Sequence, residues 1–345
     1  MKSQITRGIK FIALILALLV TVVFADRLLC FKTIHGIRQA RDMYVQPKDT
    51  IDVVFLGSSH VHYDINTALL WENYGIAAYD YSAAEQPLWI TYYYLKELCK
   101  YQSPKLAVLD LYAPASFHDE YQYYYLSDNL SGIRFSRNKI DMIKASCEPD
   151  KLWDYFPSFV TYHLRYKELN KYDFEYLFMS EEKRQEFKGF TPHFKTGEFE
   201  EPYHEYEHVT DIPDKTREYL IKIIDFCKEN GIELYLVVNP YFLGYEEAGC
   251  YNKIKEIADE QGVRFEDFND WYDSMGLDFS TCLNDGSHLN YQGSCVYSDF
   301  LGAVLKALYE IPDRRGDQRW ESWDRHVEYI RGQVERQDSE DVNEN

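Results

Sequence analysis

Short apolar runs that end in turn residues recur along this chain, and they constrain its fold more than any other feature. We predict buried strands at residues 52–57, 76–81, 106–111, 232–238 and 263–268. Helical patterns follow these runs, at residues 65–74, 87–101, 214–230, 249–261 and 291–309. Strands that alternate with helices indicate a mostly parallel sheet covered on both faces. We therefore expect a three-layer, doubly wound (flavodoxin-like) α/β fold.

The sequence divides into regions of different composition. Residues 50–310 carry the strand and helix pattern, and residues 113–210 interrupt it with a segment rich in Tyr, Phe, His and charge. We predict that this insertion is partly helical and caps the active edge of the sheet. Residues 311–345 are highly charged and nearly free of aliphatic residues, so we expect a solvated helix or a flexible tail there.

Residues 1–30 form a membrane anchor or a signal segment. Lys2, Arg7 and Lys10 precede an uncharged run at residues 11–25. A helix of that length reaches about 22 Å, so flanking residues must complete a span of about 30 Å. We predict an uncleaved, single-pass anchor with its N-terminus inside. The alternative is a cleaved signal peptide, since residues 23–25 offer a cleavage site, and both readings place the remaining chain outside the cytoplasm.

Charge and cysteine spacing exclude two classes of function. The formal net charge is −20, which argues against a nucleic-acid partner because phosphate binding needs a basic surface. The seven cysteines are scattered, with no CxxC pair and no zinc-like spacing, so we expect no metal site and no cofactor.

Two short motifs carry residue types suited to acyl chemistry. Residues 57–60, Gly-Ser-Ser-His, follow the first predicted strand, where backbone N–H groups at a helix start can bind a developing oxyanion. Residues 285–288, Asp-Gly-Ser-His, precede the last predicted helix. A carboxylate three residues before a histidine can fix the imidazole tautomer and stabilise the imidazolium formed when it takes a serine proton.

The two motifs together resemble the first and last sequence blocks of the SGNH/GDSL hydrolases. The resemblance implies that Ser59 is the nucleophile, His288 the general base and Asp285 the residue that orients it. With the anchor and the long insertion, the chain looks most like the D-alanine transfer protein and the alginate O-acetyltransferase group. It thereby implies transfer or hydrolysis of an acyl ester on a cell-surface glycopolymer, and a membrane-bound O-acyltransferase as partner.

The chain departs from the family pattern in several positions. Ser58 replaces the usual Asp, and Ser82 stands where a Gly completes the oxyanion hole. The third strand ends in Leu111-Tyr112, without the Asn of the family's third block. A non-catalytic polymer-binding or scaffold subunit is therefore the alternative reading. The triad itself does not separate a transferase from an esterase, because both use the same three groups.

Other residues carry a functional and a structural reading side by side. His60 and His62 lack further nearby ligands for a metal, so we expect His60 to pack beside the nucleophile or to contact substrate. His163 and Arg165 either bind an anionic group of the polymer or form a structural pair. A cluster of tyrosines either stacks on sugar rings or packs half-buried in the protein. Its members are Tyr121, Tyr123, Tyr124 and Tyr125.

Overall fold

Five parallel strands form the centre of the molecule. The computed structural model describes residues 2–30, 32–155, 161–200 and 207–344. The strands pair in the order β2-β1-β3-β4-β5, which confirms the predicted parallel α/β sheet and is a doubly wound order. Their bounds are β1 (Val53–Leu56), β2 (Ala78–Asp80), β3 (Leu106–Asp110), β4 (Glu233–Val238) and β5 (Arg264–Asp267).

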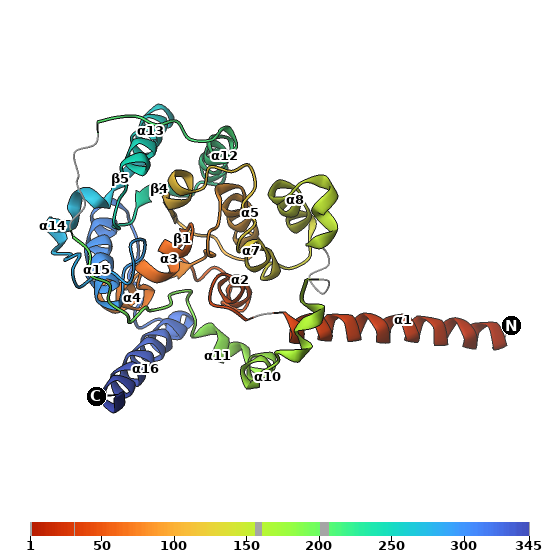
Figure 1. Ribbon diagram of the computed structural model, residues 1–345. Coiled ribbons are helices and arrows are strands. Elements are labelled where there is room, and N and C mark those ends of the chain that lie inside the picture. The colour runs from red at the N-terminus through yellow and green to blue at the C-terminus, as the bar shows by residue number, and fades with distance from the viewer. Residues whose placement is uncertain (1, 31, 156–160, 201–206, 345) are drawn as a thin grey trace.

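Helices cover both faces of this sheet (Figure 1). Alternate side chains of β1 point to opposite faces, so Phe55 is buried with side chains of α4 and α15, and Leu56 with those of α5, α12 and α13. These helices are α4 (Thr67–Tyr74), α5 (Leu88–Leu98), α12 (Asp214–Asn230), α13 (Tyr245–Gln261) and α15 (Tyr291–Leu308).

The helices begin and end at the capping residues that the sequence predicts. Gly231 ends α12 with a φ of 65°, in the left-handed region that glycine adopts without strain. The side chain of Asn290 accepts a hydrogen bond from the N–H of Gly293 and caps α15. Two short elements, η3 (Phe268–Trp271) and α14 (Tyr272–Met275), fill the connection between β5 and the last motif.

The first helix, α1 (Lys2–Leu29), projects from the globular part (Figure 1). An 18-residue window within Ile5–Leu29 has a mean hydropathy of 2.6, and the large hydrophobic side chains from Ile5 to Phe24 are exposed. Twenty-five helical residues reach about 37 Å. The helix is long and apolar enough to cross a membrane or to serve as a signal sequence.

The insertion folds as short helices that pack on different parts of the domain. Its helices α7 and α8 lie beside α2 and α5, and η2 and α10 contact α1. The chain then returns along the free edge of β2, where the N–H of Asp80 donates to the carbonyl of Lys188. Of these elements, α2 (Ile37–Met43) precedes β1. The short helices after β3 are α6 (Tyr112–Ser116), α7 (Leu126–Ser131), α8 (Arg137–Ser146), η1 (Pro149–Asp154), η2 (His163–Lys167), α10 (Lys171–Phe178) and α11 (Glu181–Gln185).

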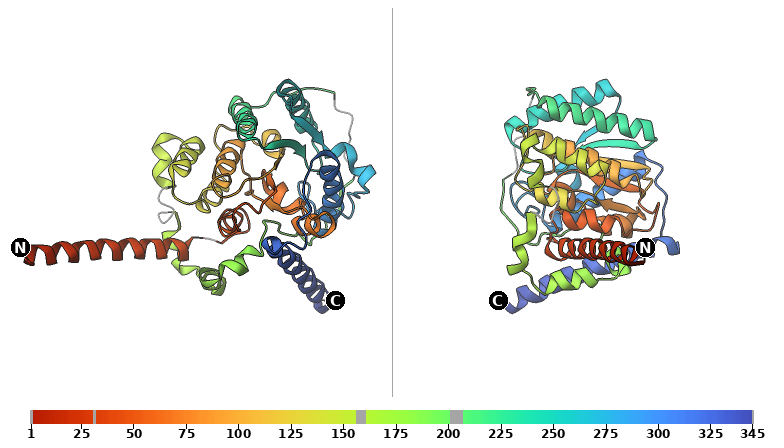
Figure 2. Two further views of the ribbon diagram at one scale, coloured as in Figure 1. Left: turned by 180° about the vertical axis from the view of Figure 1, so that it is seen from behind. Right: turned by 90° about the vertical axis from the view of Figure 1, so that its right-hand side faces the viewer.

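The C-terminal segment is a helix, one of the two predicted alternatives, but one side of this helix is buried and not solvated. After η4 (Gln318–Trp320), α16 (Glu321–Glu344) buries Trp323, Val327 and Ile330, which recur at helical spacing. The indole N–H of Trp323 donates to the carbonyl of Ala78 on β2. Because most residues of this segment are charged, its composition does not reveal the apolar stripe. The first half of α16 belongs to the core. Figure 2 shows α16 and α1 leaving the globular part in different directions.

Candidate active site

The site begins at the turn that follows β1. Gly57 has a φ of 146°, and a Cβ placed on it would lie 3.0 Å from both the Cβ of Asp110 and the Cγ2 of Val61. The turn therefore requires glycine, because the backbone passes close to the end of β3. Ser58 is then the N-cap of α3 (Ser59–Asp64), and Ser59 occupies its first turn.

Three side chains from the two ends of the domain form a hydrogen-bonded row. The Oγ of Ser59 lies 2.8 Å from Nε2 of His288, across a separation of 229 residues in the sequence. On the other side of the ring, Nδ1 of His288 lies 3.0 Å from Oδ1 of Asp285. An Nδ1–H that donates to the carboxylate leaves Nε2 free to accept the hydroxyl proton of Ser59.

Asp285 is held in its ionised form. Partial burial by itself raises the pKa of this carboxyl, but hydrogen bonds and the charge of His288 outweigh it and hold the pKa well below its usual range. Besides the ring, the carboxylate accepts from the backbone N–H groups of Ser287 and His288 and from the side chain of Asn284. These donors fix the orientation of the carboxylate that in turn fixes the ring.

The buried side chain of His60 packs against one side of this row. Its ring stacks on Tyr112 at 3.8 Å between centroids, meets Tyr241 edge to face, and lies 5.2 Å from the ring of His288. Complete burial lowers its pKa well below the usual value, and so does the neighbouring His288, so the imidazole is neutral. The described residues contain no group of three His, Cys, Asp or Glu side chains that could hold a metal ion.

Neither Ser58 nor Ser82 presents its hydroxyl to this row. The Oγ of Ser82 is buried and lies 2.9 Å from Nδ1 of His62. The Oγ of Ser58 is buried as well, and within the described part of the chain it has no hydrogen-bond partner. Any contribution of residue 82 to an oxyanion hole must therefore come from its backbone N–H.

His163 and Arg165, which the sequence offers as substrate-binding residues, both lie on η2, which packs against α1. His163 is exposed on η2. Arg165 is buried, and its Nη2 lies 2.7 Å from each carboxylate oxygen of Asp173. Its Nη1 donates to the carbonyl of Leu29 at the end of α1. The structural reading of Arg165 is thus the one that the geometry favours.

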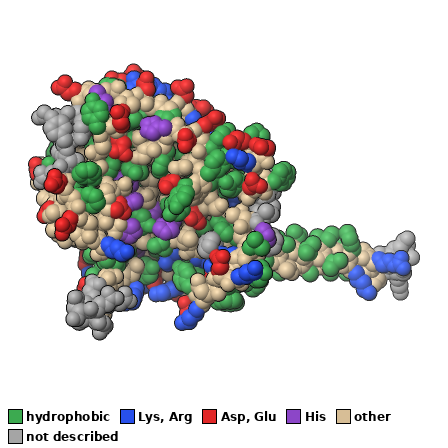
Figure 3. All heavy atoms as spheres, in the orientation of Figure 1, with side chains coloured by type: hydrophobic (Ala, Val, Ile, Leu, Met, Phe, Trp, Pro, Cys, Tyr) green, Lys and Arg blue, Asp and Glu red, His purple; other side chains and the backbone are tan. Residues whose placement is uncertain are grey.

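Three further side chains around the row have no motif in the sequence. The ring of Tyr63, four residues after Ser59 on α3, meets the ring of His288 edge to face at 5.2 Å. Its hydroxyl lies 2.8 Å from Nδ1 of His35, and its ring lies 3.6 Å from that of His193. Figure 3 shows histidine side chains gathered near the middle of this face. Of these three residues, only Tyr63 could have been placed near Ser59 from the sequence, because residues four apart share one side of a helix.

Buried polar links hold the two motifs in register. The Oδ1 of Asp64, on the last turn of α3, accepts from the N–H of Leu289, which follows His288 in the chain. The side chain of Asn239, just after β4, donates to the carbonyl of His60 and accepts from the hydroxyl of Tyr297. Because both links are buried, they resist water and fix α3 against the loop that carries His288.

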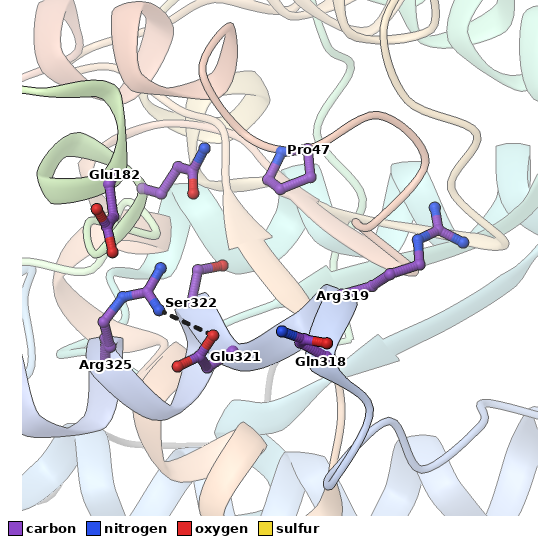
Figure 4. A pocket seen from close by; sticks show the side chains of 8 residues that line it. Pro47, Glu182, Gln318, Arg319, Glu321, Ser322 and Arg325 are labelled. Atoms are coloured by element: carbon purple, nitrogen blue, oxygen red, sulfur yellow. Dashed lines mark ion pairs between the residues drawn. The ribbon is translucent and has the colours of Figure 1, made fainter.

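A separate pocket of about 360 Å³ lies between α11 and the start of α16 (Figure 4). Its charges are mixed, and on α16 Arg325 pairs with Glu321 at 3.4 Å. None of the residues of the hydrogen-bonded row lines it.

Comparisons with known proteins add a likeness in fold. No protein-family model matches the sequence, and no curated protein matches it. Among solved structures, the chain is similar to a Bacteroides fragilis protein for which an acylhydrolase activity has been suggested. The identity is 15%, the TM-score is 0.40, and the match covers 78% of this chain and 95% of that one. Similarity at this level does not distinguish one activity from another.

Proposed function

We propose that this chain is a serine-dependent O-acyltransferase or esterase of the SGNH/GDSL type. One observation carries the proposal: Ser59, His288 and Asp285 form a continuous hydrogen-bonded row. The row lies beyond the carboxyl end of β1, which pairs with both β2 and β3 and therefore marks the point where the strand order reverses. Doubly wound sheets bind their ligands at this point.

The reaction proceeds in two steps. His288 takes the hydroxyl proton of Ser59 on Nε2 while Oγ attacks the acyl carbon, and Asp285 stabilises the imidazolium. The tetrahedral oxyanion accepts a hydrogen bond from the N–H of Ser59. Collapse breaks the ester bond, and the leaving alcohol takes the proton from His288. In the second step a polymer hydroxyl or water gives its proton to Nε2 of His288 and attacks the acyl carbon of the acyl-serine. Collapse breaks the bond to Oγ of Ser59, which takes the proton back from His288, and the acyl group leaves on the polymer or as the free acid.

The substrate class and the location follow from the resemblance and from α1. An apolar stretch of 25 residues at the N-terminus supports an anchor that leaves the domain outside the cytoplasm, with a cleaved signal as the alternative. Figure 3 shows basic side chains near the N-terminal end of this helix. We infer an acetyl or D-alanyl group on a cell-surface glycopolymer, delivered by a membrane-bound O-acyltransferase.

A scaffold function remains the competing proposal. Losing one oxyanion donor costs about 10²–10³-fold in rate. No Asn follows β3, where the family has one, and the hydroxyl of Ser82 is engaged by His62. A polymer-binding subunit would keep the fold without needing these donors.

Covalent labelling separates the two proposals. The full-length protein is treated with a fluorophosphonate, and its turnover of an activated acetyl ester is measured. We expect an adduct on Ser59, and we expect Ser59→Ala to lower turnover at least about 10³-fold while the fold persists. Ser58→Ala is the matched control: it should keep both adduct and turnover, because its buried hydroxyl makes no described hydrogen bond. No adduct at high reagent excess would favour the scaffold.

A further inference from the structure

The insertion builds a socket for the last turn of α1. Leu29 and Cys30 are buried against Tyr162, with Ala25 and Leu169 partly buried at the edge of this cluster. A helix end leaves its last carbonyl groups without partners inside the helix. Here the insertion and the following loop supply them: Arg165 donates to the carbonyls of residues 29 and 30, and Lys32 donates to that of residue 28.

A buried ion cluster fixes this socket to α10. The carboxylate of Asp173 receives two hydrogen bonds of 2.7 Å from Arg165 and one of 3.2 Å from Lys32, with 1% of its side chain exposed. Burial opposes ionisation of Asp173, but the N–H of Asn170 and the two cations hold its pKa below the usual value. Removing one partner from such a cluster leaves a buried charge uncompensated, so α1, η2 and α10 stay together as a unit.

The outer side of the same unit is apolar. Leu164 and Tyr166 on η2 are 63% and 58% exposed, and Phe174 and Phe178 on α10 are 45% and 77% exposed. Asp173 and Tyr176 form the buried face of α10. The outward face carries Lys171, Phe174 and Phe178, which lie three, four and seven residues apart and share one side of a helix.

We propose that residues 163–178, the interfacial segment, lie in the headgroup region of the lipid bilayer that α1 crosses. This proposal rests on the membrane anchoring proposed above. Aromatic and aliphatic side chains flanked by lysines suit the boundary between headgroups and acyl chains. The occupant is lipid because the segment packs directly on the end of a 25-residue apolar helix, where a membrane surface would begin. The domain then has two membrane contacts, and these fix the orientation of its active site.

Lipid photolabelling tests the proposal on the full-length chain. The protein is placed in nanodiscs of phosphatidylcholine and phosphatidylglycerol, part of which carries a diazirine near the headgroup, and adducts are mapped by mass spectrometry. We expect adducts on α1 and on the interfacial segment. The exposed apolar residues Trp271 and Leu308, which lie outside that segment, should remain unlabelled.

Two outcomes would overturn the proposal in distinguishable ways. In the first outcome, α1 is labelled but the interfacial segment is labelled no more than Trp271 and Leu308. This result would refute the second membrane contact and leave the anchor and the enzyme proposal intact. An unlabelled α1 removes the anchor itself.

A surface variant sharpens the test. The triple variant Leu164→Gln, Phe174→Gln, Phe178→Gln should lower labelling of the segment at least about threefold and leave labelling of α1 unchanged. Turnover of a small activated ester should also persist, because these three side chains are exposed on η2 and α10, which pack against α1. Unchanged labelling of the segment would contradict the proposal.

Discussion

Acidification should weaken the docking of α16 through one buried histidine. The ring of His326 is buried between α4 and α11: its Nε2 lies 2.9 Å from Oγ1 of Thr67, and its Nδ1 lies 2.8 Å from the carbonyl of Glu186. Nδ1–H therefore donates to the carbonyl, and Nε2 accepts from the hydroxyl. Burial, together with the nearby ammonium of Lys188, lowers the pKa of His326 to about 3.

The sign and size of the effect follow from proton linkage. An unfolded chain protonates this histidine near pH 6.5, whereas the folded one resists until about pH 3. Between these values the unfolded state holds one more proton, so the free energy of unfolding falls as the pH falls. The slope is about 1.4 kcal/mol per pH unit, or at most about 3 kcal/mol between pH 6.5 and 4.

Urea unfolding of the full-length chain in mild detergent, followed by tryptophan fluorescence at pH 7 to 4, measures this slope. His326→Gln should be less stable at pH 7, because it loses packing and one of two buried hydrogen bonds. It should then lose up to about 3 kcal/mol less than the parent chain on acidification. Other buried histidines titrate in both proteins and cancel in the difference. Parallel pH dependences would refute the reasoning.

Two further predictions concern the site. Asp285→Asn should lower kcat by about 10³–10⁴-fold, because an amide favours the wrong tautomer of His288; steady-state kinetics on an activated ester would contradict this if the loss stayed within tenfold. Gly57→Ala should lower the free energy of unfolding by about 2 kcal/mol or more, since alanine would be strained at this φ and its Cβ would crowd Asp110 and Val61. A urea midpoint equal to that of the parent chain would refute the second argument.

The sheet could be predicted because its signal is local. Each of the five strands falls inside an apolar run that the sequence marks, and turn residues such as Gly231 end the helices where expected. The proximity of Ser59 and His288 could be predicted only from the fold, because the fold places both residues at the edge of the sheet where the strands end. Composition misled us for α16, where Trp323 and Val327 lie at helical spacing within a charged segment.

The surroundings of the row could not be read from the sequence. His35 precedes β1, and His193 lies between β3 and β4 in the chain. No sequence spacing links either histidine to Tyr63. Arg165 was open to two readings because an arginine beside a histidine looks the same in either role. Its buried partner, Asp173, decided the matter, and burial is a property of the assembled insertion.

The span of 229 residues between the hydroxyl and the imidazole has a consequence for biogenesis. A chain made from its N-terminus carries Ser59 long before His288 exists, and α16 arrives later still. Under the proposed mechanism, a growing chain, or a fragment that stops before residue 285, would hold Ser59 without its general base. If Ser59 is the nucleophile proposed above, the chain must be complete before it can react with esters.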